Sequence, residues 1–185
     1  LSQESIDYAV QMAQSEVFGA LDVLVNNAGI GITGPVEVQD MEATRLAFDT
    51  NVFGYHRMAR AVLPAMREAG KGQIFNVSSQ LGRVIAPSAG HYCATKFAVE
   101  AMSEQLAYEL VPHGIEVTII EPGGYPTEIW QNRNRYNNAL KARAEEKHLS
   151  GYPALVARMG TETGDGRDTD IDDVPRAIAE IIAMP

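Results

Sequence analysis

Three short apolar runs, separated by long helical stretches, most constrain how this chain can fold. The runs lie at residues 21–26, 73–78 and 115–120, and helical patterns fill the intervals at about 41–69 and 92–111. Runs of this length and composition are typical of buried strands. Strands joined by helical crossovers pair in parallel. The sequence therefore predicts an α/β fold, a doubly wound parallel sheet in three α/β/α layers.

Polar and small residues follow the first two runs at their carboxyl ends. The first run ends in Asn26-Asn27-Ala28-Gly29 and the second in Ser78-Ser79. Ligands of open parallel sheets bind at this edge. Asn51 places an amide among apolar positions of the intervening helical stretch, where it needs partners. We expect a ligand site at this edge, and we expect Asn26 to tie adjacent strands together.

Tyr92 and Lys96 are four residues apart, which puts a phenol and an ammonium on one face of a helix. A tyrosine with its ordinary pKa near ~10 exchanges protons poorly at neutral pH, and a fixed positive charge beside it favours the phenolate. The pair alone is more typical of an ordinary amphipathic helix with a solvated amine than of a catalytic site. Ser79 adds weight to the chemical interpretation, because the second strand delivers it toward the start of this helix.

Together these motifs resemble the short-chain dehydrogenase/reductase superfamily. The resemblance spans residues 1 to about 127, and thirteen positions separate Ser79 from Tyr92. It is carried by Asn26-Asn27-Ala28-Gly29, Asn51, the strand end Asn76-Val77-Ser78-Ser79, the Tyr92/Lys96 pair, and Pro122-Gly123 with Thr127. It implies a Rossmann-type fold and an NAD(P)-dependent oxidoreductase that interconverts a carbonyl and an alcohol.

The resemblance implies a catalytic role for four residues. Tyr92 would pass a proton while the nicotinamide passes a hydride, and Lys96 would lower the pKa of Tyr92 and hold the nicotinamide ribose. Ser79 would bind the substrate oxygen, and Asn51 would hold a water that links Lys96 to solvent. Two structural alternatives stay open. Ser79 could cap the following turn, and the Asn51 amide could be satisfied by a neighbouring backbone carbonyl.

The resemblance also implies a binding site for NAD or NADP. In the family, the small residues Asn27, Ala28 and Gly29 let the backbone approach the cofactor, and Tyr92 and Lys96 also contact it. The turn after the third strand would meet the nicotinamide carboxamide through Pro122, Gly123, Tyr125 and Thr127. The family commonly has an aliphatic residue where Tyr125 stands. The choice between the two dinucleotides depends on a strand that we do not find in this sequence.

Residues 125–165 are interpreted as an excursion that covers the substrate in this family. Candidate substrate contacts are Gln80, Tyr125, Trp130 and Tyr136, with ordinary packing as the alternative for Trp130 and Tyr136. Basic residues also gather in this segment, and we interpret them as a solvated helix face. They are Arg133, Arg135, Lys141, Arg143 and Lys147.

Two other patterns do not qualify as sites. Residues 29–34 match G-x-G-x-x-G, but that fingerprint must open a helix at once, and Pro35 follows it here. The acidic run 168–172 resembles the start of an EF-hand loop, but Asp173 stands where the loop requires glycine. We expect no metal, and we expect the acidic run to lead into a helix that reaches Ile182.

Residues 1–19 have the pattern of an amphipathic helix, and nothing before Leu21 resembles the family's phosphate-binding glycine turn. The first of the three strands would then expose an apolar edge. We expect residues 1–185 to form one Rossmann-type domain that is incomplete at its N-terminus and also lacks the family's last strand. The chain is thus expected to be a segment of a larger protein and to be inactive alone.

Composition excludes several classes of function. The net charge of −9 argues against nucleic acid as a partner. No apolar run approaches the ~20 residues needed to cross a bilayer, and no secretory signal is visible, so no membrane partner is expected and the cytoplasm is the default location. The lone Cys93 excludes an internal disulfide. The resemblance implies a homodimer or homotetramer formed through the two long helices.

The sequence therefore predicts an oxidoreductase acting on a small carbonyl or alcohol. Two alternatives are kept. A serine hydrolase could pair Ser79 with His91, although no G-x-S-x-G elbow surrounds the serine. A binding or regulatory protein could retain the fold without turnover. Covalent labelling by a fluorophosphonate would test the hydrolase, and cofactor titration followed by a hydride-transfer assay separates the non-catalytic case from an enzyme.

Overall fold

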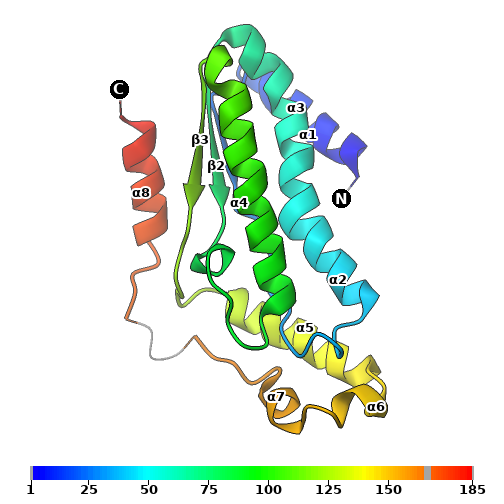
Figure 1. The fold of residues 1–185 in the computed structure, drawn as a ribbon. Helices are drawn as coiled ribbons and strands as arrows, with labels where there is room; N and C mark the ends of the chain where they lie inside the picture. The colour runs from blue at the N-terminus through cyan, green and yellow to red at the C-terminus, as the bar shows by residue number, and fades with distance from the viewer. Residues whose placement is uncertain (1, 165–167, 185) are drawn as a thin grey trace.

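The computed structural model describes residues 2–164 and 168–184, and Figure 1 shows a parallel sheet flanked by helices. The strands are β1 (Val23–Asn26), β2 (Gly72–Val77) and β3 (Ile115–Ile120), in the order β1-β2-β3. Asn26 pairs in register with Asn76, and Val77 with Ile120, so the carboxyl ends of the strands lie at one edge. The three predicted strands are confirmed, with bounds that move by two residues at most.

One face of the sheet is covered by α1 (Gln3–Glu16), α3 (Gly54–Ala69) and α4 (Gly90–Leu110). In Figure 1, α8 (Asp173–Ile182) lies on the other side of the strands from α1 and α3. The helices expected at 1–19 and up to Ile182 are therefore present, although Leu1 lies outside the described residues. The main core joins the three covering helices to the strands through Ile6, Val10, Leu24, Val62, Met66, Ile74, Leu110 and Ile115.

The helical stretch predicted at 41–69 is divided by a π-helical turn. It consists of α2 (Met41–Phe48), the turn Asp49–Phe53, and α3. A π-helical turn places an extra residue in the helical ladder, a feature that often marks a functional site. Asn51 stands in the middle of this turn and is fully buried. Apolar periodicity predicts the helix but does not reveal the extra residue.

The segment after β3 forms α5 (Ile129–Arg143), α6 (Glu146–Leu149) and α7 (Pro153–Arg158). In Figure 1, α5 crosses the molecule just beyond the carboxyl ends of the strands. A second core holds this segment against the chain that follows β1, through Ile32, Val38, Ala43, Leu140 and Met159. The predicted excursion 125–165 therefore packs beside the sheet edge, and its last residue lies outside the described residues. Its function as a substrate cover stays a prediction.

Two expectations can be compared with the structure. The first is an exposed apolar edge on the first strand: β1 is an edge strand of the described sheet, and its Val25 is 43% exposed. The second concerns membrane-spanning helices. Within residues 2–164 and 168–184, no helix has both the length and the apolar composition needed to cross a bilayer.

The turns that precede β2 and β3 pack on each other through glycine. Gly70 and Gly114 both have left-handed φ angles, of 68° and 66°. A Cβ at Gly114 would lie 2.5 Å from the carbonyl oxygen of Gly70, whereas one at Gly70 would meet nothing within 4 Å. The two positions thus share a backbone conformation but differ in available space.

Gly114→Ala is expected to destabilise the protein by about 2–4 kcal/mol, because the conformational strain adds to a backbone clash. Gly70→Ala is the matched control, with strain alone and a loss of about 1 kcal/mol. Urea unfolding of both variants measures the difference. Equal losses would contradict the clash.

Candidate active site

The four predicted catalytic residues are buried together at the carboxyl edge of the sheet. Ser79 follows β2, Tyr92 and Lys96 lie in α4, and Asn51 lies in the π-helical turn. Lys96 is only 3% exposed, although lysine is rarely buried without a partner. The alternative of a solvated amine on an ordinary helix is therefore wrong.

The Lys96 ammonium points toward the end of β2. Its Nζ donates to the Val77 carbonyl at 2.8 Å and lies 5.7 and 5.8 Å from the ring centroids of Tyr55 and Tyr92. Burial lowers the pKa of Lys96 to about 8, against the opposing charge of Glu100. An ammonium has three donors, and Val77 uses one of them among the described contacts. Two donors are left for a ligand.

The loop after β1 passes beside this ammonium. A Cβ built on Gly29 would lie 3.7 Å from Lys96 Nζ and 3.5 Å from Asn51 Oδ1. Asn27, Ala28 and Gly29 are exposed, whereas Asn51 and Lys96 are buried. An exposed, small-residue backbone next to free ammonium donors fits the nicotinamide ribose of a dinucleotide.

Tyr92 is 7% exposed, and burial raises the pKa of its phenol. A hydrogen bond with Ser79 and the charge of Arg133 act in the opposite direction and lower the pKa, but they are smaller effects. This net direction differs from the lowering that the Tyr92/Lys96 spacing implied. The reason is that the buried phenol loses contact with water, which disfavours its charged form.

Ser79 combines its two predicted roles. Its Oγ accepts from Leu81 N at 3.1 Å, which caps the 3₁₀ turn Gln80–Gly82, and donates weakly to the Pro122 carbonyl at 3.4 Å. It is also a hydrogen-bond partner of Tyr92. The cap fixes the hydroxyl beside the phenol, so the structural role supports the chemical one.

Asn51 clamps the loop after β1 to helix α4. Its Oδ1 accepts from Ile30 N at 2.8 Å, and its Nδ2 donates to the Ile30 carbonyl at 2.9 Å and to Thr95 Oγ1 at 3.0 Å. Thr95 Oγ1 in turn donates to the Tyr92 carbonyl at 2.7 Å. The alternative that a neighbouring backbone satisfies the amide is therefore confirmed. The water-holding role stays a prediction.

Asn51→Ala is expected to lower the free energy of unfolding by about 2–4 kcal/mol, because it leaves buried donors and acceptors unpaired. Asn138→Ala, at an exposed asparagine of α5, is the control and should change stability by less than about 0.5 kcal/mol. Urea unfolding measures both. An Asn51 variant as stable as the control would rule out the clamp.

The strand-tying residue Asn26 and the remaining predicted cofactor residues lie on opposite sides of β2. Asn26, at the end of β1, donates from Nδ2 to Asn76 Oδ1 at 2.8 Å, so its predicted strand-tying role is confirmed. After β3, the Pro122 carbonyl accepts from Gln80 N at 3.0 Å. Gly123 and Thr127 are exposed, and Pro122 and Tyr125 are half-buried. A ligand bound at this edge can therefore contact residues on both sides of β2, the strand that Ser79 follows.

The candidate substrate residues divide into two groups. Gln80 is exposed near Gly123, and Trp130 is half-buried, with its Nε1 donating to the Tyr125 carbonyl at 2.7 Å. These residues stand at the sheet edge. Tyr136, in contrast, packs against the second core. Ordinary packing is the better description of Tyr136.

Arg133 is the site residue that the sequence analysis missed, and its assignment to a solvated face is wrong. It is 9% exposed, and its guanidinium carbon lies 5.8 Å from the Tyr92 ring centroid and 4.6 Å from the Trp130 ring centroid. Its spacing of three from Trp130 on a predicted helix was the available signal. The other basic residues of this segment obscured that signal, because a run that is polar as a whole is typical of a solvated helix face.

The hydrolase alternative finds no support in the geometry. His91 Nδ1 is buried and has no hydrogen-bond partner among the described residues. The described contacts of Ser79 are those with Leu81, Pro122 and Tyr92. Among the described residues, His91 is therefore not bonded to the Ser79 hydroxyl that it would have to activate.

A buried phenol, hydroxyl and ammonium therefore lie together at the carboxyl edge of a Rossmann-type sheet. The family model described as short chain dehydrogenase matches residues 2–138. The chain belongs to the short-chain dehydrogenase family.

Individual relatives agree with this family. A 3-ketodihydrosphingosine reductase of Bacteroides thetaiotaomicron is 45% identical over 130 residues, which cover 70% of this chain and 48% of that protein. An uncharacterized oxidoreductase of Bacillus subtilis is 37% identical over 169 residues, which cover 89% of this chain and 56% of that protein. The chain thus spans about half the length of these curated relatives.

Solved structures show the same fold. A short chain dehydrogenase/reductase from Burkholderia phymatum in complex with NAD matches with a TM-score of 0.80 and 26% identity, over 98% of this chain and 64% of that one. A 3-ketoacyl-(acyl-carrier-protein) reductase from Brucella melitensis, complexed with NADH, matches with a TM-score of 0.68 and 28% identity, over 88% of this chain and 71% of that one.

Proposed function

We propose that this protein interconverts a carbonyl and an alcohol with NAD or NADP, and that Tyr92 is its proton-transfer residue. The observation that carries the proposal is the burial of Tyr92, Ser79 and Lys96 within one cluster at the carboxyl edge of the sheet. Burial of a lysine and a tyrosine together is costly for folding, and such perturbed groups concentrate at functional sites.

The proposed mechanism assigns one task to each side chain. Tyr92 donates its phenolic proton to the substrate oxygen in reduction and accepts it in oxidation. Ser79 donates a hydrogen bond to that oxygen and stabilises the charge that develops there. The dinucleotide supplies or accepts the hydride. Lys96 would hold the ribose hydroxyls with its unused donors, and Asn51 fixes the loop after β1 beside it.

The exposed residues at the same edge would form the rest of the cofactor site. Asn27, Ala28 and Gly29 after β1, and the turn from Pro122 to Thr127 after β3, would hold the nicotinamide half of the dinucleotide. The NAD and NADH complexes of the structural relatives support a nicotinamide dinucleotide here. Both dinucleotides remain in the proposal.

The experiment is a cofactor titration followed by an assay of the full-length protein. Binding of NADH and NADPH is measured by fluorescence, and a panel of ketones and aldehydes is then screened for loss of the reduced nicotinamide signal. Turnover of at least one carbonyl compound is expected. Cofactor binding without any turnover would favour the non-catalytic alternative. Absence of both would contradict the proposal.

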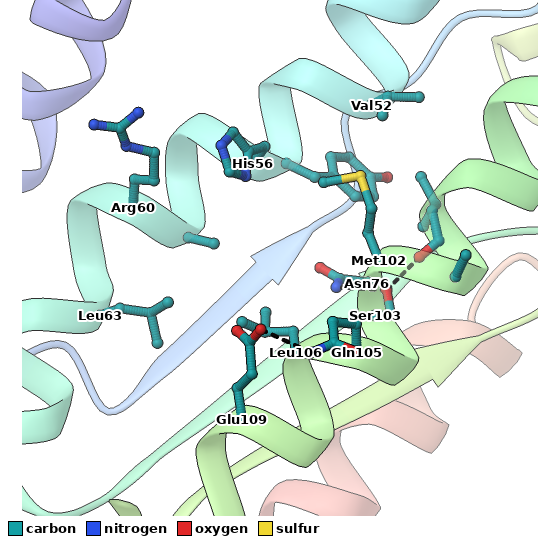
Figure 2. A pocket seen from close by; sticks show the side chains of 14 residues that line it. Val52, His56, Arg60, Leu63, Asn76, Met102, Ser103, Gln105, Leu106 and Glu109 are labelled. Carbon is teal, nitrogen blue, oxygen red and sulfur yellow. Dashed lines mark hydrogen bonds between the residues drawn. The ribbon is translucent and has the colours of Figure 1, made fainter.

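We also propose that α3 and α4 pair with the same helices of a second copy. Figure 2 shows the groove between them, with Asn76 and Ser103 joined by a hydrogen bond at its base. The groove has a volume of about 460 Å³, and Met102 on its rim is 39% exposed. Its apolar lining includes Val52, Ala59, Leu63, Val99 and Leu106. An apolar patch of this kind is typical of an interface.

Met102→Glu is expected to convert a dimer into a monomer, because it places a charge on a buried apolar contact. Tyr108→Glu is the matched control on the same helix, at a residue that is 76% exposed and outside the groove lining. Sedimentation velocity measures the assembly state. A monomeric parent protein, or a Met102 variant that remains dimeric, would overturn this interface.

A further inference from the structure

We propose that Arg133 selects substrates that carry a carboxylate close to the reacting carbonyl or alcohol. The inference rests on the proposed function, because it concerns the substrate of that same site. It names a charge requirement that neither the family motifs nor the catalytic residues supply.

Arg133 has the right position for this task. It belongs to α5, which crosses the carboxyl edge of the sheet in Figure 1. Its guanidinium carbon lies over the Tyr92 ring, 5.8 Å from the ring centroid, and its charge lowers the pKa of the phenol, so the two groups act on one another. A carboxylate bound to the guanidinium would bring its neighbouring carbon atoms close to the phenol.

The guanidinium is held rigidly. It lies over the Trp130 ring at 4.6 Å from the centroid, and its NH1 forms an ion pair with Glu162 Oε2 at 2.7 Å. Gly31 makes the room, since a Cβ there would lie 2.8 Å from Arg133 Nε. A planar guanidinium fixed by stacking is well suited to two-point recognition of a carboxylate.

The guanidinium also has unused bonding capacity. Its Nε is buried and has no hydrogen-bond partner within the described part of the chain. A buried donor without a partner costs about 1–3 kcal/mol, which a bound anion would recover. Glu162, the carboxylate that now pairs with Arg133, is 38% exposed at its side chain. Glu162 therefore occupies the position of an exchangeable partner.

A purely structural role for Arg133 makes an opposite prediction. If Arg133 only tied α5 to Glu162, removing either partner would have the same sign of effect on substrate use. If Arg133 binds a substrate carboxylate, loss of the arginine weakens acid binding, whereas Glu162→Gln removes a competitor and strengthens it. The sign of the Glu162 effect thus separates the two roles.

The experiment uses the full-length protein and a series of 3-oxo acids together with their methyl esters. The readout is the ratio of kcat/KM for each acid to that for its ester. Arg133→Met is expected to lower this ratio about 10- to 100-fold, as for loss of a hydrogen-bonded charge pair. Glu162→Gln is expected to raise it. Arg133→Lys keeps the charge without the planar fork and should give an intermediate ratio.

A binding measurement separates failure of this inference from failure of the proposed function. Trp130 is the one tryptophan of these 185 residues, and it stacks on Arg133. Propionate should change its fluorescence saturably in the wild type and not in Arg133→Met, and propionamide should have no effect. An unchanged acid-to-ester ratio, or equal propionate binding by both proteins, would overturn the inference. If the protein turns over the esters but Arg133→Met leaves the acid-to-ester ratio unchanged, only this inference fails and the oxidoreductase proposal still holds.

Discussion

Replacement of Tyr92 by phenylalanine is expected to reduce kcat/KM by about 10²- to 10⁴-fold, the usual contribution of a positioned general acid. The change removes only the hydroxyl, so the buried ring keeps its packing within α4. Stability should change by no more than about 1 kcal/mol, because one hydrogen bond, to Ser79, is lost. Steady-state kinetics and urea unfolding measure the two effects.

The control for this variant is Tyr108→Phe, a tyrosine of the same helix that is 76% exposed. It should retain full turnover. Binding of reduced dinucleotide by the Tyr92 variant, measured by fluorescence, distinguishes a chemical defect from a binding defect. Wild-type turnover by Tyr92→Phe would refute the assignment of the proton-transfer residue.

Lys96→Met is expected to abolish most activity while making the fold more stable. The pKa of Lys96 falls from 10.5 to about 8 on burial, which corresponds to about 3 kcal/mol of destabilisation while the amine is charged. Methionine fits the same apolar path without this cost. The Val77 carbonyl keeps a partner, because Tyr55 OH also donates to it at 3.0 Å. We expect a gain of about 1–3 kcal/mol at neutral pH, reduced by the lost attraction to Glu100.

The pH dependence gives this prediction a sharper form. Below pH 8, both the folded and unfolded states of the wild type hold the Lys96 proton, so the folded state bears the full cost. Between pH 8 and 10.5 the folded state releases the proton first, and the wild type gains relative stability. The advantage of Lys96→Met should therefore shrink across this window. Lys71→Met, at an amine with a 70% exposed side chain, should show no such trend.

Urea unfolding of the three proteins at several pH values provides the measurement, together with kcat/KM for the turnover effect. A variant that loses stability at neutral pH would show that Lys96 contributes to folding more than its burial costs. In that case the interpretation of Lys96 as a residue kept for function at the expense of stability would be wrong.

Local patterns were sufficient to predict the parts of the fold that depend on backbone periodicity. The apolar runs predicted β2 and β3 almost to the residue, and the polar end of β1 predicted that Asn26 ties adjacent strands, which it does through Asn76. The same patterns placed Tyr92 and Lys96 on one helix face. They did not reveal that Lys96 Nζ bonds to Val77, because the path of a long side chain depends on packing that spacing does not encode.

Tertiary contacts explain the remaining differences. Arg133 was grouped with its basic neighbours, yet contacts with Trp130, Gly31 and Glu162 bury it. These partners lie on three separate segments, and no single window of sequence contains them. The direction of the Tyr92 pKa shift is of the same kind, since burial by the whole fold outweighs nearby charges.

The Asn51 clamp has a consequence for how the site responds to a ligand. A displacement of the Ile30 backbone would be passed through the Asn51 amide to Thr95, and from Thr95 to the carbonyl of Tyr92. All the intermediate atoms are buried or partly buried, so the close packing around them leaves little free space to absorb the displacement. A dinucleotide that presses on the loop after β1 would therefore shift the helix that carries the proton donor, so cofactor binding would adjust the position of Tyr92.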